Sequence, residues 1–368
     1  MMTGKTLQDR IRGSLIAGAA GDALGYYVEF KRYDAIVREF GEGGIRAYRP
    51  FRGMDVAAIS DDTQMTLFTA DGLLGHAADQ HVGRAQHGRA VYVYRAYQDW
   101  YATQWGDSLR ETDSHLMQEK RLFAARAPGN TCMSAICSGR MGSIDSPFNK
   151  SKGCGGVMRV APLGLMAGAQ LSDKLCVLGA ELAAITHGHP LGYIPAAMLT
   201  HIVARAAYRE DDALTLEDVV RESVEMTERM FSDMPEYGRA VVLTNRAIEL
   251  AKNDRSDLEN IRQLGEGWVG EEALAIAVYC CLRHADDLSA ALAAAVNHDG
   301  DSDSTGAVAG NILGAWIGFD AIPAQWKQGL ELSDFVLDMA DDLYTASRML
   351  AGEEPPQAFM ERYAGRRV

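Results

Sequence analysis

Apolar residues recur three and four positions apart along most of this 368-residue chain, the spacing that places side chains on one face of an α-helix. Leu7, Ile11, Leu15 and Ile16 form one such face. Segments that alternate apolar and polar residues are scarce, and the best of them, residues 91–94, also fits a helix. Only 10 prolines interrupt the chain. The sequence therefore predicts an all-α protein, compact and built from many helices.

The length and charge of the chain exclude several classes of protein. It is long enough for one large domain or two smaller ones, and no linker or low-complexity run marks a boundary. A net charge of -14 argues against a nucleic-acid partner, because phosphate binding needs basic patches. No apolar run reaches the length of a membrane span, and the N-terminus has no signal-peptide core. We expect a cytoplasmic protein with reduced cysteines.

Two acidic clusters, far apart in the chain, predict one metal site. The first is 60–63 (Ser-Asp-Asp-Thr) and the second is 299–305 (Asp-Gly-Asp-Ser-Asp-Ser-Thr). Each precedes a run of small and apolar residues that is predicted to be helical, 64–74 and 306–318. Mg²⁺ and Mn²⁺ take about six oxygen ligands, which one short loop rarely supplies. The alternative is that each cluster only caps the following helix. Together, the clusters favour one or two ions held by Ser60, Asp61, Asp62, Asp301, Asp303 and Ser304.

A glycine-rich segment, Ser-Lys-Gly-Cys-Gly-Gly at 151–156, predicts an anion site. Glycines let backbone N–H groups approach a diphosphate closely. The alternative is a tight loop between helices, and no P-loop motif is present. Residues 265–270 formally match G-x-G-x-x-G, but a helix rather than a strand precedes them, so we expect only a loop before a helix from Glu271.

Two further motifs suggest a pocket. His187 and His189 lie near a predicted helix end, and we expect His187 to line a cleft rather than to bind metal. At 21–25 (Gly-Asp-Ala-Leu-Gly) we expect a helix to end in a glycine turn, with Glu29 following. The alternative for this second motif is a simple helix cap and a surface acid.

These motifs together resemble the ADP-ribosylglycohydrolases, a family that includes dinitrogenase reductase-activating glycohydrolase and the ADP-ribosylarginine hydrolases. The resemblance runs from about residue 10 to about residue 350, in the family's order. The matching stretches are RGSLIAGAAGDALG (12–25), SDDTQM (60–65), KGCGGVMRVAPLG (152–164), THGHPLG (186–192), GEGWVGEEALAIA (265–277) and GDSDSTGAVAGNILGA (300–315). The resemblance implies a single all-α domain over 1–368, with 1–9 as a short extension, around a binuclear site for two Mg²⁺ or Mn²⁺ ions.

The resemblance also implies roles for individual residues. The metal ligands fall on the six residues of the two acidic clusters, and Glu29 falls on the acidic position of a loop that closes over the ribose. The diphosphate loop matches Ser151, Gly153, Cys154 and Gly155, and His187 matches a histidine of the substrate cleft. Cys154 replaces the asparagine of some relatives.

The implied activity is hydrolysis of the bond that joins ADP-ribose to a modified protein side chain. The SDDT and DSDST motifs resemble the arginine-specific members. Members that act on nitrogenase reductase carry an acid before the Gly-Asn-Thr matched here by 129–131, and this chain lacks it. We expect Asp62 to act as the acid or base, Asp61 to support it as a ligand, and Glu29 to orient substrate or water.

Several biological roles remain open at this stage. The partners expected are an ADP-ribosylated protein and ADP-ribose. Two roles fit such an enzyme: housekeeping, and immunity against an ADP-ribosylating toxin. An immunity protein could instead occlude the toxin's active site, with residues 1–8 as a plug. The remaining alternatives are a non-catalytic relative and a hydrolase of small ADP-ribosyl conjugates.

Overall fold

A computed structural model describes residues 6–51, 53–105, 112–167, 171–211 and 213–365, and this part of the chain contains helices but no strand. The all-α prediction is confirmed. The α-helices are α1 (Leu7–Tyr26), α2 (Tyr33–Phe40), α3 (Asp61–His81), α4 (Arg89–Gln104), α5 (Asn130–Cys137), α6 (Ala161–Leu165), α7 (Asp173–Ala184), α8 (Pro190–Ala207), α9 (Leu216–Phe231), α10 (Tyr237–Leu250), α11 (Asp257–Ile261), α12 (Gly270–Arg283), α13 (Leu288–Val296), α14 (Ser302–Ile317), α15 (Ala324–Lys327), α16 (Ser333–Leu350) and α17 (Gln357–Tyr363). Short 3₁₀ helices lie at His115–Gln118, Lys120–Leu122 and Cys154–Gly156.

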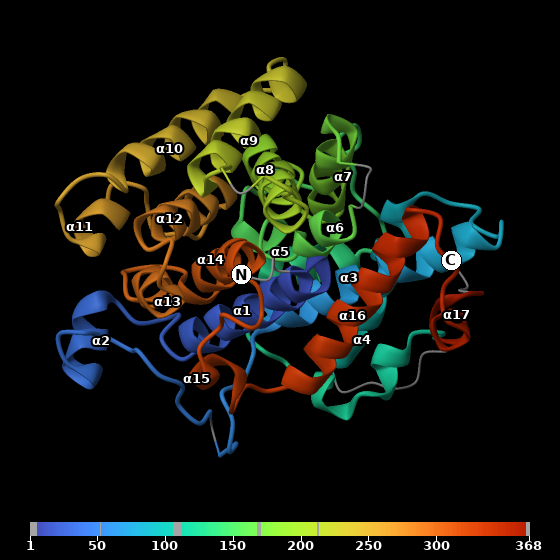
Figure 1. The fold of residues 1–368 in the computed structure, drawn as a ribbon, viewed down its shortest axis with the longest axis horizontal. Helices are drawn as coiled ribbons and strands as arrows, with labels where there is room; N and C mark the ends of the chain where they lie inside the picture. The colour runs from blue at the N-terminus through green and yellow to red at the C-terminus, as the bar shows by residue number, and fades with distance from the viewer. Residues whose placement is uncertain (1–5, 52, 106–111, 168–170, 212, 366–368) are drawn as a thin grey trace.

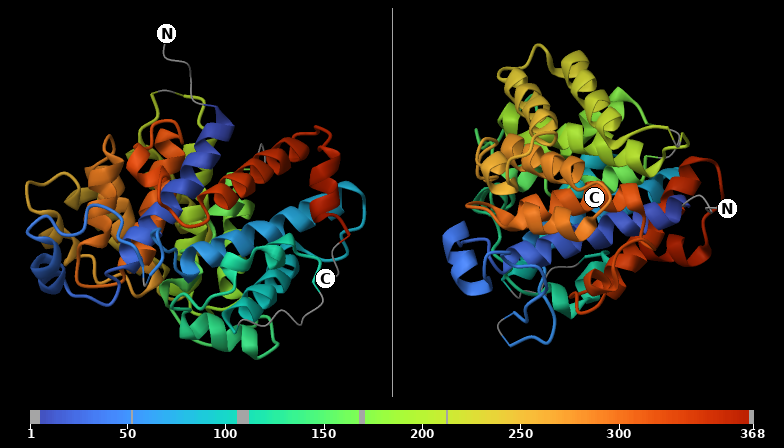
Figure 2. Two further views of the ribbon diagram at one scale, coloured as in Figure 1. Left: turned by 90° about the horizontal axis from the view of Figure 1, so that it is seen from below. Right: turned by 60° about the vertical axis from the view of Figure 1, so that its left-hand side comes forward.

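The centre of the fold is the pair α1 and α14, which pack along most of their length (Figure 1). On one side lie α3, α4, α16 and α17, and on the other lie α9 to α13. The two views of Figure 2 show the same arrangement, with α16 alongside α3. Within the described residues, no helix is both long and apolar enough to cross a bilayer.

Small residues at every fourth position let α1 and α14 approach unusually closely. A Cβ added to Gly21 would lie 2.0 Å from the carbonyl oxygen of Gly306, and one added to Gly310 would lie 1.9 Å from that of Ala17. These pairs show that the two helices run antiparallel, backbone against backbone. The contacts place the C-terminal half of α1 against the first turn of α14.

This contact corrects the prediction of a turn at 21–25. The segment is fully helical, because α1 continues to Tyr26. The glycines serve close helix packing rather than chain reversal: a Cβ on Gly25 would lie 2.2 Å from the carbonyl oxygen of Ser302. Glu29 follows just after the helix end, as expected.

Both acidic clusters extend from the N-cap into the first turn of a helix, and in the second cluster only Asp299 and Gly300 precede the cap. Helix α3 begins at Asp61, with Ser60 as its N-cap accepting from the Asp62 N–H, and α14 begins at Ser302, with Asp301 as its N-cap. The predicted helices began at 64 and 306, three or four residues too late. Acidic side chains are stable at these positions because they accept unpaired N–H groups and lie at the positive end of the helix dipole.

Within the extension predicted at 1–9, residues 7–9 are helical. Residues 1–5, which include most of the proposed plug at 1–8, lie outside the described residues. Thr6 caps α1 by accepting from the N–H of Asp9, so residues 7–9 belong to the first turn of that helix. Gln8 is held there by a 2.9 Å hydrogen bond to Asp341.

Candidate functional site

A cleft of about 630 Å³ lies over the first turns of α3 and α14. Its walls also include the segment after α1, the start of α5, the 3₁₀ turn at Cys154–Gly156 and the loop before α12. Ten of the twelve predicted site residues line it: Glu29, Asp61, Asp62, Gly153, Cys154, Gly155, His187, Asp301, Asp303 and Ser304. The tertiary structure thus brings together residues up to about 270 positions apart in sequence.

The other two predicted residues lie behind the lining. Ser60 is fully buried, and its hydroxyl oxygen accepts the N–H of Asp62 at 3.1 Å. The Ser151 hydroxyl bonds to the Thr131 hydroxyl at 3.1 Å and accepts the N–H of Gly153 at 3.3 Å. In this arrangement both serines position residues of the cleft.

Five buried carboxylates line the cleft, those of Glu29, Asp61, Asp62, Asp301 and Asp303. Carboxylate oxygens of Glu29, Asp301 and Asp303 lie within 4.8 Å of one another. Throughout the described part of the chain, no ion pair joins any of the five to a lysine, arginine or histidine. One oxygen of Glu29 (Oε2) and one of Asp62 (Oδ2) are buried with no hydrogen-bond partner.

The buried acidic side chains of the cleft favour binding of a cation. Burial, with the charge of Asp303 next, raises the pKa of Glu29 to about 11. Burial also raises the pKa values of Asp61, Asp62, Asp301 and Asp303. Isolated buried charges are costly unless paired or bound to metal. A set of converging carboxylate and hydroxyl oxygens, two of them unpartnered, fits hard divalent cations.

Asp22, which the sequence analysis did not assign to the site, fixes the first turn of α3 from behind. It is fully buried on α1, and its carboxylate accepts the N–H of Ser60 at 3.0 Å, the N–H of Thr63 at 3.1 Å and the Thr63 hydroxyl. Burial and the charge of Asp303 raise the pKa of Asp22 to about 7. Its position between the close-packed Gly21 and Gly25 is the signal that could have identified it.

Asp299 belongs to the same acidic run but not to the cleft. Its carboxylate accepts the N–H of Tyr33 at 3.1 Å and pairs with Arg262 at 2.9 Å. Gly300 then turns the chain beneath the loop before α12, where the N–H of Asp301 donates to the carbonyl of Glu266 at 2.8 Å. Asp299 therefore tethers the surface loops, whereas Asp301 and Asp303 face the cleft.

The glycine loop is braced by the loop before α12. The N–H of Cys154 donates to the carbonyl of Trp268 at 3.2 Å, and the N–H of Gly270 donates to the carbonyl of Lys152 at 2.8 Å. Residues 265–270 form the predicted loop before a helix, and Glu272 accepts the N–H groups of Glu266 and Gly267. The same loop also supports the cleft wall.

His187 lies against the glycine loop as a neutral imidazole. A Cβ on Gly153 would lie 3.2 Å from its Nε2. Burial, with the charge of Arg159, lowers the pKa of His187 to about 3. Arg159 donates to the Thr186 hydroxyl oxygen at 2.7 Å, and that hydroxyl lies 2.8 Å from Nδ1 of His187. The hydroxyl hydrogen is therefore available to Nδ1, which favours the tautomer that carries its proton on Nε2, toward the cleft.

Other contributors to the cleft were missed by the sequence analysis. The N–H of Gly129 donates to Asp61 at 3.1 Å. Trp268 lines the cleft, and its ring stacks on that of Phe30 with centroids 6.3 Å apart. Both rings are exposed, Phe30 by 76% and Trp268 by 40%. An aromatic residue directly after the predicted Glu29, and one inside the 265–270 loop, were the available signals.

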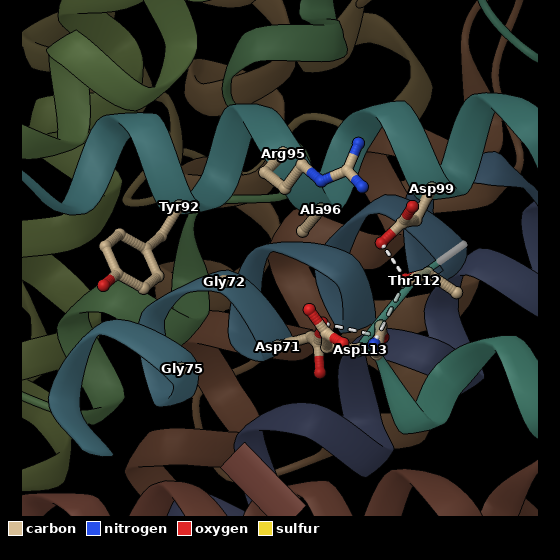
Figure 3. Close-up of a pocket in the computed structure, with 10 residues that line it drawn as sticks. Asp71, Gly72, Gly75, Tyr92, Arg95, Ala96, Asp99, Thr112 and Asp113 are labelled. Carbon is tan, nitrogen blue, oxygen red and sulfur yellow. Dashed lines mark hydrogen bonds between the residues drawn. The ribbon is translucent and has the colours of Figure 1, made fainter. Parts of the chain in front are cut away.

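A second, smaller hollow lies between α3 and α4, apart from the acidic cleft (Figure 3). Two hydroxyls bond to acidic groups within it: the Thr112 hydroxyl donates to Asp99 at 2.7 Å, and the Ser114 hydroxyl donates to Asp71 at 2.9 Å. These bonds tie the segment after 111 to both helices, so this hollow has a structural explanation.

Comparisons with known proteins agree with the geometry. The ADP-ribosylglycohydrolase family model matches residues 3–352. The ADP-ribosylhydrolase ARH3 of Gallus gallus is 28% identical over 236 residues, 58% of this chain and 63% of that protein. The ADP-ribosyl-dinitrogen reductase glycohydrolase of Rhodospirillum rubrum is 24% identical over 344 residues, 90% of this chain and 93% of that protein. A solved structure, an ADP-ribosylglycohydrolase-related protein complex, shares the fold with a TM-score of 0.60 at 22% identity, over 93% of this chain and 99% of that one.

Proposed function

Because the chain belongs to the ADP-ribosylglycohydrolase family, we propose that it is a metal-dependent hydrolase that removes mono-ADP-ribose from modified arginine side chains. Family membership supports hydrolysis of ADP-ribose from modified substrates. The observation that carries the metal dependence is the group of five buried carboxylates without a basic partner, lining a cleft beside a glycine loop.

The proposed metal ligands are Asp61, Asp62, Asp301, Asp303 and Ser304, which all face the cleft. Ser60, predicted as a further ligand, accepts the N–H of Asp62, and we assign it the orientation of that residue. Two Mg²⁺ or Mn²⁺ ions held there would supply Lewis acidity toward substrate hydroxyl or water oxygens. Asp22 holds the first turn of α3, and therefore Asp61 and Asp62, in place.

The chain's own residues provide the remaining chemistry. Asp62 has a buried carboxylate oxygen with no partner inside the protein, so we assign it the proton transfer between the leaving group and water. Glu29 also has an unpartnered oxygen at the cleft, and we assign it the orientation of the ribose or the attacking water. His187 would donate from Nε2 to a substrate oxygen.

The glycine loop would bind the diphosphate with fewer N–H groups than its sequence suggests. The N–H of Gly153 already donates to Ser151, and that of Cys154 to Trp268. We therefore assign the diphosphate contact to Gly155, whose position beside His187 places it on the cleft wall.

Charge supports arginine as the modified residue. Among the described residues, the cleft lining contains five carboxylates and no lysine or arginine. A guanidinium leaving group is positively charged and fits such acidic surroundings better than a neutral serine hydroxyl. The SDDT and DSDST motifs favour the same substrate.

Release of ADP-ribose from an arginine-ADP-ribosylated protein, with magnesium and with chelator, tests this proposal. A serine-linked substrate is run in parallel. We expect magnesium-dependent release from the arginine-linked substrate; release from the serine-linked substrate alone would refute the arginine assignment, and release in chelator would refute the metal dependence.

A matched pair of variants sharpens the test. Asp303→Asn should lose at least about tenfold in activity, because it removes a proposed ligand. Asp299→Asn, in the same acidic run but outside the cleft, should retain activity. Equal losses in both variants would contradict the assigned site.

Whether the activity serves toxin immunity is tested by co-expressing an ADP-ribosylating toxin with the wild type or with Asp62→Ala. Protection by both proteins would favour occlusion of the toxin's active site.

A further inference from the structure

The thiol of Cys154 faces the carboxylates of the cleft. Its Sγ donates to Oδ2 of Asp301 at 2.8 Å and lies 3.6 Å from the hydroxyl oxygen of Ser304. The loop holds it there, because the Cys154 N–H donates to the Trp268 carbonyl, and its own carbonyl accepts the N–H of Val157 at 2.9 Å. A sulfur atom is thus fixed beside two of the proposed metal ligands.

A second observation is that the same cleft contains buried oxygens with unmet hydrogen-bonding capacity. Oδ2 of Asp62 and Oε2 of Glu29 line the same cleft without hydrogen-bond partners, and their residues are only 3% and 8% exposed. The cleft therefore offers soft sulfur and hard oxygen donors together. Magnesium chemistry uses only the oxygens, so the proposed reaction leaves the sulfur unexplained.

We propose that Cys154 makes this centre a binding site for thiophilic divalent cations such as Zn²⁺, held by the Cys154 sulfur and the Asp301 carboxylate. This inference rests on the metal site of the proposed function. Zinc takes four ligands from cysteine sulfur, histidine nitrogen and carboxylate oxygen, and thiolates select it over magnesium. On binding, the S–H bond breaks, a metal–sulfur bond forms and the proton passes to the buffer.

The consequence is a choice between two classes of ion at one centre. Hard cations would use the carboxylates and leave the thiol as a donor to Asp301, whereas Zn²⁺ would occupy the same oxygens and the sulfur. Zinc would therefore displace magnesium and stop the proposed hydrolysis. Substitution of cysteine by asparagine, found at this position in some relatives according to the sequence resemblance, would remove that sensitivity.

Titration with Cd²⁺, a spectroscopic substitute for zinc, tests the inference without any activity assay. The exposed Cys137 is first replaced by alanine, and all variants carry this change. We expect a saturable ultraviolet charge-transfer band of a cadmium thiolate, reaching its plateau at a stoichiometric amount of metal. The band should be lost in Cys154→Ser and kept in Cys132→Ala, the matched control, since Cys132 lines the same cleft but its sulfur accepts from Arg159 at 3.2 Å.

Binding of Mn²⁺, followed by electron paramagnetic resonance, separates the possible failures. Cys154→Ser should keep Mn²⁺ binding, which also shows that its site is folded, while its zinc affinity falls about tenfold or more. Mn²⁺ binding with no cadmium–thiolate band, or a band that persists in Cys154→Ser, would overturn the thiophilic site and leave the proposed function standing. Absence of Mn²⁺ binding by the wild type would overturn both.

Discussion

Replacing Gly310 with alanine is expected to force α1 and α14 apart. A Cβ there would lie 1.9 Å from the carbonyl oxygen of Ala17, 2.4 Å from its carbonyl carbon and 2.7 Å from the nitrogen of Gly18. All three atoms belong to the backbone, so no side chain can rotate away. Reaching ordinary van der Waals separation requires the helices to move by about 1.5 Å, at the centre of a tightly packed core.

The expected cost follows from two opposing effects. Overpacking a core destabilises by about 1–3 kcal/mol, and a clash confined to backbone atoms belongs at the upper end. Alanine regains about 1 kcal/mol of helix propensity relative to glycine. We therefore expect the free energy of unfolding to fall by about 2 kcal/mol.

Gly238→Ala is the matched control, because Gly238 also lies in a helix but an added Cβ would meet no atom within 4 Å. The free energy of unfolding of this variant should rise by up to about 1 kcal/mol. Urea denaturation, followed by far-ultraviolet circular dichroism, measures both changes from the transition midpoints and slopes. If Gly310→Ala is as stable as the wild type or more stable, the close backbone packing inferred for α1 and α14 is wrong.

Three further predictions concern buried polar groups. Arg126→Met should lower the free energy of unfolding by about 3 kcal/mol, because it leaves the carboxylate of Glu331 without its cation. Glu331 lies 2.6 Å from Arg126, and its side chain is only 4% exposed. Urea denaturation measures the loss, and the double variant Arg126→Met with Glu331→Leu should recover part of it. Asp22→Ala should weaken Mn²⁺ binding about tenfold or more by freeing the N–H groups of Ser60 and Thr63; unchanged affinity in calorimetry would refute its positioning role. Burial and the charge of Arg89 lower the pKa of His76 to about 4 in the folded protein. The unfolded chain therefore binds this proton more readily, so the contribution of His76 to the free energy of unfolding, fully present above about pH 6.5, is lost as the pH falls toward 4. In the His76→Gln variant, the free energy of unfolding should fall less steeply between pH 7 and pH 4 in denaturation experiments. An unchanged pH dependence would contradict this role of His76.

The acidic clusters show how much of the site can be predicted from local sequence. Carboxylates next to hydroxyls identify hard-cation chemistry from residue types alone, and ten of the twelve predicted residues do line one cleft. Ser60 and Ser151 lie just behind the cleft lining, because a motif gives the residue but not the depth of its side chain, and their assigned roles stay predictions. Asp299 shows the same limit: it is as acidic as Asp301, yet it pairs with Arg262 at the surface.

By itself the sequence determined the helical class, the family resemblance and the residue types of the site, because helical periodicity and short motifs are local properties. The tertiary structure decided how those residues are used. Gly21 and Gly25 were ambiguous between a turn and a close packing contact, and only the backbone of α14 resolves them. Likewise, Asp22 and Cys154 acquire their roles from partners distant in the chain, the first turn of α3 and Asp301. The physical reason is that close packing and burial depend on which helices contact one another, and short sequence patterns do not specify those contacts.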